Sequence, residues 1–154
     1  MAITYEPIAT TTSSGGGNIS FTSIPATYTD LFLSFVGDTG GITYLRYNND
    51  NGSNYSSNLF WGNGSTTVAA RYSESWTFVI PPSSGNIVTQ LISIQNYSNS
   101  AVYKTSVSRA GFAQGLTSQG IQLWRNTAAI NRVDLTNSGT YGDFTATLYG
   151  IKAA

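Results

Sequence analysis

The polar loop from Arg46 to Gly64 contains the spacing that comes nearest to a chemical site. Oxygen-bearing side chains and a glycine stand there at alternate positions: Asn48, Asp50, Gly52 and Asn54. This arrangement is similar to a calcium loop, but such a loop needs several carboxylates to hold a hard divalent cation. Because Asp50 is the only one, we expect no metal. We predict instead a hairpin in which Asn51–Gly52 forms a type I′ turn.

Catalytic chemistry has few possible carriers, because the chain contains no cysteine and no histidine. This excludes serine triads, cysteine–histidine dyads and zinc hydrolases. Glu74 is the only charged side chain on the apolar face of its expected strand, where burial would raise its pKa. A glycosidase needs a second carboxylate facing the first, and the sequence shows no such pair. We therefore expect a kink or break near residues 73–75 that turns Glu74 to solvent, and we expect neither a cofactor nor an enzyme.

Aromatic residues are the stronger signal, since they make up 13% of the chain. Such side chains stack on sugars, anchor protein interfaces or fill a core, and all three uses are open here. Trp124 stands on the opposite face from Ile121 and Leu123, which predicts either a contact between subunits or cover by an arm. The residues that we assign to a protein interface are Ile3, Tyr5, Ile8, Tyr47, Tyr55, Phe60, Trp61 and Trp124.

The charge balance limits the classes of partner. Seven basic and seven acidic residues give a formal net charge of zero, and only 9% of residues are charged. No basic run is present to neutralise phosphates, so we expect no nucleic-acid partner. No apolar stretch approaches the ~18 residues that span a bilayer, so we expect no membrane role. A polar but uncharged surface lacks the repulsion that keeps many proteins monomeric, which favours contact with copies of itself or with a partner.

Alternation of apolar and polar residues extends along most of the chain and predicts short strands. Clusters of Gly, Asn, Ser and Pro separate these strands, and no segment of ten or more residues has a helical period. We predict one all-β domain over residues 18–154, a single antiparallel β-sandwich of jelly-roll type with about 8–10 strands and negligible helix. Residues 1–17 are expected to form either an N-terminal arm or an edge strand.

Three stretches together resemble a family of small β-rich virion proteins of tailed bacteriophages, including phages of cyanobacteria. They are YEPIATTT at 5–12, SIPATYTDLFLSF at 23–35 with RYNNDNGSNYSS at 46–57, and FTATLYGIK at 144–152. The resemblance covers most of the chain. It implies a jelly-roll-like fold, usually trimeric, and brings no catalytic residues. Related segments occur both in capsid decoration (cement) proteins and in terminal domains of tail fibres.

The choice between head and tail depends on the domain organisation. We expect the chain to be one complete domain without the shaft that a fibre protein needs. The prediction is therefore a cement protein, made in the host cytoplasm, that binds the major capsid protein on the outer surface of the virion as a homotrimer. The alternative is a tail-fibre domain that recognises a host-surface glycan.

Overall fold

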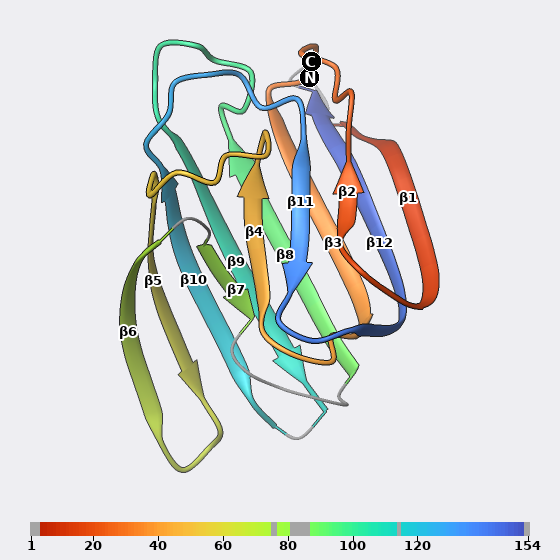
Figure 1. Ribbon diagram of the computed structural model, residues 1–154, viewed down its shortest axis with the longest axis vertical. Helices are drawn as coiled ribbons and strands as arrows, with labels where there is room; N and C mark the ends of the chain where they lie inside the picture. The colour runs from red at the N-terminus through yellow and green to blue at the C-terminus, as the bar shows by residue number, and fades with distance from the viewer. Residues whose placement is uncertain (1–3, 75–76, 81–86, 114, 153–154) are drawn as a thin grey trace.

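The described chain folds into strands and contains no helix (Figure 1). The computed structural model describes residues 4–74, 77–80, 87–113 and 115–152. The strands are β1 (Thr4–Gly16), β2 (Ile19–Phe21), β3 (Asp30–Asp38), β4 (Thr43–Tyr47), β5 (Tyr55–Gly62), β6 (Thr67–Glu74), β7 (Thr77–Ile80), β8 (Ile87–Gln95), β9 (Lys104–Phe112), β10 (Thr117–Trp124), β11 (Val133–Asn137) and β12 (Tyr141–Lys152).

The strands form two sheets that pack face to face. The larger sheet has the order β1-β12-β3-β8-β9-β10-β5-β6, and the smaller has the order β2-β11-β4-β7. Every neighbouring pair is antiparallel. In Figure 1 the smaller sheet lies in front of the larger one, which extends beyond it on both sides. The predicted all-β antiparallel sandwich is confirmed, and the jelly-roll type stays a prediction.

The described chain has twelve strands rather than the expected eight to ten. Residues 67–80 contain two strands, β6 and β7, which belong to different sheets. The other addition is β1, which pairs with β12 along its length and has a bulge between Pro7 and Ala9. Over Thr4–Gly16 the structure therefore has the edge strand rather than the arm. Ile8, one of the residues assigned to a protein interface, is partly buried there and packs against the core.

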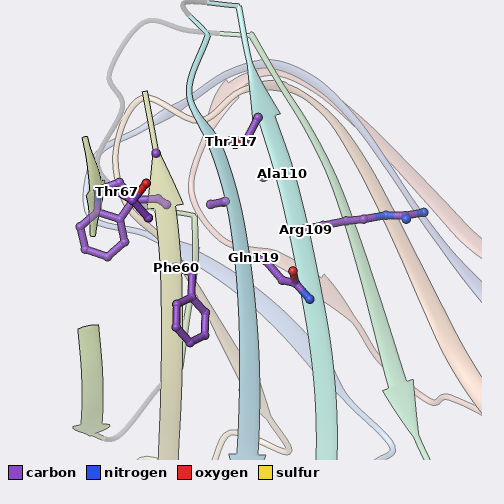
Figure 2. Close-up of a pocket in the computed structure, with 9 residues that line it drawn as sticks. Phe60, Thr67, Arg109, Ala110, Thr117 and Gln119 are labelled. Carbon is purple, nitrogen blue, oxygen red and sulfur yellow. The ribbon is translucent and has the colours of Figure 1, made fainter. Parts of the chain in front are cut away.

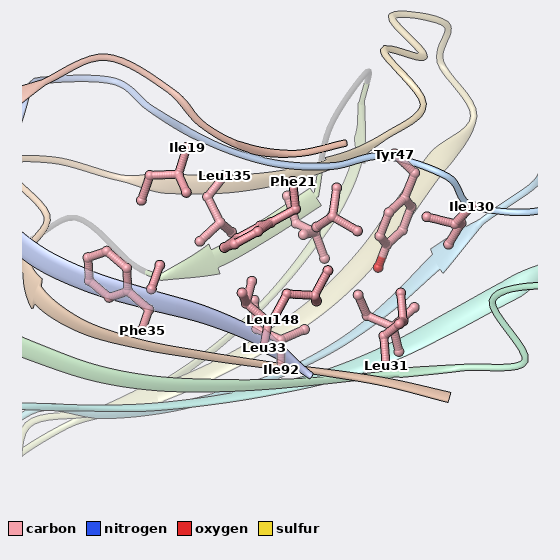
Figure 3. Packing of buried hydrophobic residues seen from close by; sticks show 14 of the residues in the cluster. Ile19, Phe21, Leu31, Leu33, Phe35, Tyr47, Ile92, Ile130, Leu135 and Leu148 are labelled. Atoms are coloured by element: carbon pink, nitrogen blue, oxygen red, sulfur yellow. The ribbon is translucent and has the colours of Figure 1, made fainter. Parts of the chain in front are cut away.

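Alternation along each strand separates an inner face from an outer face. In β3, Leu31, Leu33 and Phe35 point inward and are buried, whereas Val36 is 45% exposed. Both faces of this strand carry apolar residues, but the smaller sheet covers only the inner one. Figure 3 shows the resulting core, in which side chains such as Leu135 of the smaller sheet face Leu148 of the larger.

Beside this apolar core, the inner face of β9 and β10 carries a buried polar network. Ser106 Oγ donates to Gln122 Oε1 (3.0 Å), and Gln122 Nε2 donates to Ser108 Oγ (2.8 Å). The Tyr47 hydroxyl donates to Ser106 Oγ from the smaller sheet (3.1 Å). Gly120 makes room for the network, because a Cβ there would lie 2.8 Å from Ser108 Oγ. Paired buried polar groups of this kind fix how the two sheets meet.

Candidate functional site: the outer face of the eight-stranded sheet

The loop after β4 is organised by the side chain of Asp50. Its carboxylate accepts hydrogen bonds from the Gly52 N–H (2.8 Å), Asn54 Nδ2 (2.9 Å) and Trp124 Nε1 (2.7 Å). Burial raises the pKa of Asp50, but the hydrogen bonds from Asn54, Trp124 and Gly52 outweigh it and hold the pKa below its usual value. Donors of the protein itself therefore contact the oxygens that a cation would bind. Within the described ranges, no three acidic side chains come together as a metal site would require.

The tight turn of this loop is earlier in the chain than predicted. Asn48 and Asn49 have φ of 51° and 56°, and the Asp50 N–H donates to the Tyr47 carbonyl (2.9 Å). These two asparagines, which tolerate the left-handed conformation, are thus the central residues of the turn. The type I′ turn predicted at Asn51–Gly52 is wrong, because Gly52 has no positive φ and instead donates to the Asp50 side chain.

Three of the predicted interface residues lie in the core instead. Tyr47, Tyr55 and Trp124 are 1%, 0% and 1% exposed, so in this fold they cannot contact a partner. Their rings pack together, with centroids 5.5 Å apart for Tyr47–Trp124 and 6.3 Å for Tyr55–Trp124. Burial raises the pKa of Tyr47 and of Tyr55 above the usual range. Trp124 does face away from Ile121, but towards the smaller sheet rather than towards a subunit or an arm.

The remaining predicted interface residues have different environments. Tyr5 and Phe60 are exposed on the outer face of the larger sheet. Trp61 is half-buried at the end of β5, and Ile8 is partly buried against the core. Ile3 lies outside the described residues. The structure thus leaves Tyr5, Phe60 and Trp61 available for contacts.

Large exposed apolar side chains gather on this outer face. Each is between 45% and 56% exposed: Tyr5, Val36, Phe60, Ile87 and Ile121. Exposed apolar side chains that lie close together mark interaction sites. The smaller sheet covers the other side, so this face is the candidate functional site.

The strand register places one outward row across all eight strands. From β6 to β1 it contains Ala69, Phe60, Gln119, Arg109, Leu91, Ser34, Thr147 and Thr10. Arg109 is the only charged residue of this row. Its cross-strand neighbours are Gln119 on β10 and Leu91 on β8.

Several open hollows meet at Arg109. One of about 440 Å³ lies between Phe60, Trp61, Gln119 and Arg109 (Figure 2). A second of about 300 Å³ and a third of about 400 Å³ also include Arg109. In Figure 2 the Arg109 side chain extends away from Phe60 towards β8, and so reaches from one hollow to the next.

The expected position of Glu74 agrees with the structure, since its side chain is exposed at the end of β6. Arg109 and Gln119 were not identified from the sequence. A usable signal was present, because Arg109 alternates with residues of a strand in which Ser106 and Ser108 point inward. The alternation along β9 could therefore have placed a cation in the middle of the outer face.

Comparison with known proteins adds no identification. Neither a protein-family model nor a curated protein matches the chain. An exo-inulinase from Aspergillus awamori is similar at 13% identity and a TM-score of 0.38, covering 96% of this chain and 29% of that chain. Eiger TNF from S. frugiperda is similar at 12% identity and a TM-score of 0.19, covering 97% of this chain and 96% of that chain. At these TM-scores neither likeness carries an argument about function.

Proposed function

We propose that the protein is a capsid decoration (cement) protein, a structural protein on the outer surface of a bacteriophage head. The observation that carries this proposal is the face of the larger sheet that the smaller sheet leaves uncovered, on which Val36, Phe60, Ile87 and Ile121 are exposed. The resemblance of residues 5–12, 23–35, 46–57 and 144–152 to virion proteins supports it. So does the β-sandwich, which is a rigid support for a contact surface.

The contact with the shell is assigned to one end of the outer face. Val36 and Ile87 lie there, where β3 ends and β8 begins, and both are exposed. Two open hollows adjoin them, one of about 620 Å³ beside Phe144 and one of about 390 Å³ beside Leu116. An apolar ridge between hollows suits a complementary protein surface. We call Val36, Ile87 and these hollows the end patch.

The mechanism is mass action. A protein that binds the assembled shell but not its separated subunits shifts the equilibrium towards the particle. The end patch contains few charges, so attachment depends on apolar and hydrogen-bonded contacts. Such attachment changes little with salt concentration.

The test is binding to purified heads of the encoding phage, followed by electron microscopy. Ile87→Asp and Val36→Asp each place a charge in the end patch, and we expect either one to weaken binding by roughly tenfold or more. Val102→Asp is the matched control, since Val102 is also exposed but precedes β9 at the opposite end of the sandwich. Wild-type protein that leaves heads undecorated would overturn the proposal, and equal binding by all variants would overturn the end patch.

The second candidate is a tail-fibre domain that recognises a host-surface glycan. The observation in its favour is the hollow of Figure 2, where Phe60 and Trp61 offer aromatic surface beside Gln119. Aromatic rings next to hydrogen-bonding groups suit sugars. Binding to whole host cells without binding to heads would favour this candidate.

A further inference from the structure

The hollow of about 400 Å³ at the centre of the outer face has the composition of a small-ligand site. Its apolar lining comes from Phe32, Leu91 and Val107 on three adjacent strands. Its volume lies in the range of about 300–1,000 Å³ that is usual for such sites. Most ligand sites combine an apolar lining with a few convergent polar groups, and this hollow has both.

Its polar side chains are available to a ligand. Ser93, Arg109 and Gln119 line the hollow, with Tyr5 beside them. In the part of the chain that the structure describes, none of these side chains makes a hydrogen bond or an ion pair. Four groups that can hydrogen-bond therefore converge on one space.

Arg109 is not held by a partner within the described chain, unlike four of the other basic residues. Arg132 and Lys152 pair with carboxylates, and Lys104 and Arg125 donate to backbone carbonyls. Arg71 on β6 also makes no hydrogen bond or ion pair among the described residues, but it lies outside this hollow. The guanidinium of Arg109 has no such partner among the described residues. Because its N–H groups form a planar fork, it suits a carboxylate that accepts two parallel hydrogen bonds.

The sheet itself supplies no carboxylate near this point. The acidic residues on the outer face stand at strand ends: Asp30 and Asp38 in β3 and Asp143 in β12. Asp30 and Asp38 already accept hydrogen bonds, from the backbone N–H of Asn96 and of Gly40. Among the described residues, therefore, no carboxylate occupies the centre of this face, and we assign the negative group to a ligand.

The other side chains of the hollow suit parts of a ligand other than its negative charge. The rings of Tyr5 and Phe32 meet edge to face with centroids 5.6 Å apart, and they offer an apolar wall for C–H groups. The amide of Gln119 and the hydroxyl of Ser93 both donate and accept, as recognition of ligand hydroxyls requires. A ligand with a carboxylate, several hydroxyls and an apolar face would use all of them.

We infer that the hollow around Arg109 binds a hexuronic acid, either free or as one residue of an acidic polysaccharide. The sugar carboxylate pairs with Arg109, its hydroxyls bond to Gln119 and Ser93, and its C–H face packs on Tyr5 and Phe32. This site lies apart from the end patch, so the inference goes beyond the decoration role and does not depend on it.

The test is an NMR titration of the purified protein with glucuronic acid, and with glucose as the neutral sugar of the same shape. We expect glucuronic acid to bind at least about tenfold more tightly than glucose, since one charge-assisted pair separates them. The amide shifts should concentrate at Ser93, Arg109 and Gln119. Arg109→Met should remove this preference, and Arg109→Lys should restore only part of it, because lysine keeps the charge without the fork.

The matched control is Arg71→Met, which makes the same change on the same face but on the edge strand β6. It should bind glucuronic acid as the wild type does. Equal affinity for glucuronic acid and glucose would overturn the inference, and so would unchanged binding by a folded Arg109→Met protein. If glutarate binds as tightly as glucuronic acid, the site recognises a carboxylate alone and the sugar assignment is wrong. None of these results depends on binding to heads.

Discussion

Asp50 connects parts of the chain that are distant in sequence. Trp124, 74 positions away, donates to the same carboxylate as Asn54 and the Gly52 N–H. The carboxylate therefore holds the loop after β4 against the end of β10. Its charge is stabilised by neutral donors alone, which explains why its pKa is lowered despite burial.

We predict that Asp50→Asn destabilises the protein by about 1–3 kcal/mol at pH 7. The Nδ2 amino group of the asparagine would face the N–H donors that contact the carboxylate in the wild type. One of these donors would then lose its acceptor. The folded-state pKa lies below the usual value of 3.8, so the stabilisation is complete above that pH. It is lost as pH falls through the folded-state pKa, so the difference between variant and wild type should shrink there.

Urea unfolding between about pH 2 and pH 7 measures this difference. Asp143→Asn is the control, because Asp143 is exposed, and we expect it to change stability by less than about 0.5 kcal/mol. An Asp50→Asn protein as stable as the wild type at pH 7 would contradict the role of this carboxylate. The composition of the loop from Arg46 to Gly64 pointed to it as a candidate site. The hydrogen bond from Trp124 to Asp50 was not predictable, because it requires the pairing of β5 with β10.

At the scale of elements, β1 shows what period-2 patterning can and cannot predict. Alternation identified the strands, since it depends on which side chains face the core. It did not show that residues 67–80 divide between two sheets, because both parts have the same period. Alternation also did not decide whether residues 1–17 form an arm or an edge strand. The edge strand depends on pairing with β12, which is distant in sequence, as in the Thr10–Thr147 pair.

We predict that deleting residues 2–12 lowers the melting temperature by about 10 °C or more, because it removes most of β1 and its cover over β12. Ile8 also leaves the core. Thermal unfolding followed by circular dichroism measures the effect. Deleting only residues 2 and 3 is the control, and it should leave the melting temperature unchanged. A folded protein with unchanged stability that no longer binds heads would mean that the segment acts as an arm.

At the scale of the whole molecule, the unequal sheets decide what stays exposed. Four strands cannot cover eight, so apolar residues of the outer face remain in solvent. Composition predicted a weakly charged surface, but not its position. Of the aromatic residues assigned to an interface, Tyr5 and Phe60 are exposed, whereas Tyr47, Tyr55 and Trp124 are buried. The sequence around these five aromatic residues does not distinguish the exposed ones from the buried ones. Only the packing of the two sheets does.

Tyr5 and Phe60 lie towards opposite edges of the outer face, on β1 and on β5 next to β6. When one edge of a protein contacts a different edge of an identical copy, the contact is heterologous. A series of such contacts closes into a ring if the rotation from each copy to the next has the right angle. We therefore predict a homotrimer in which the β5–β6 edge of one copy meets the β1–β12 edge of the next.

Size-exclusion chromatography with light scattering should give three times the 16.4 kDa of one chain. Phe60→Asp should raise the dissociation constant at least about tenfold, since it places a charge where the edges meet. Val102→Asp, at an exposed position outside these edges, should leave the trimer intact. A wild-type protein that is monomeric at micromolar concentration would contradict the ring, because the three contacts would then be too weak to hold the copies together.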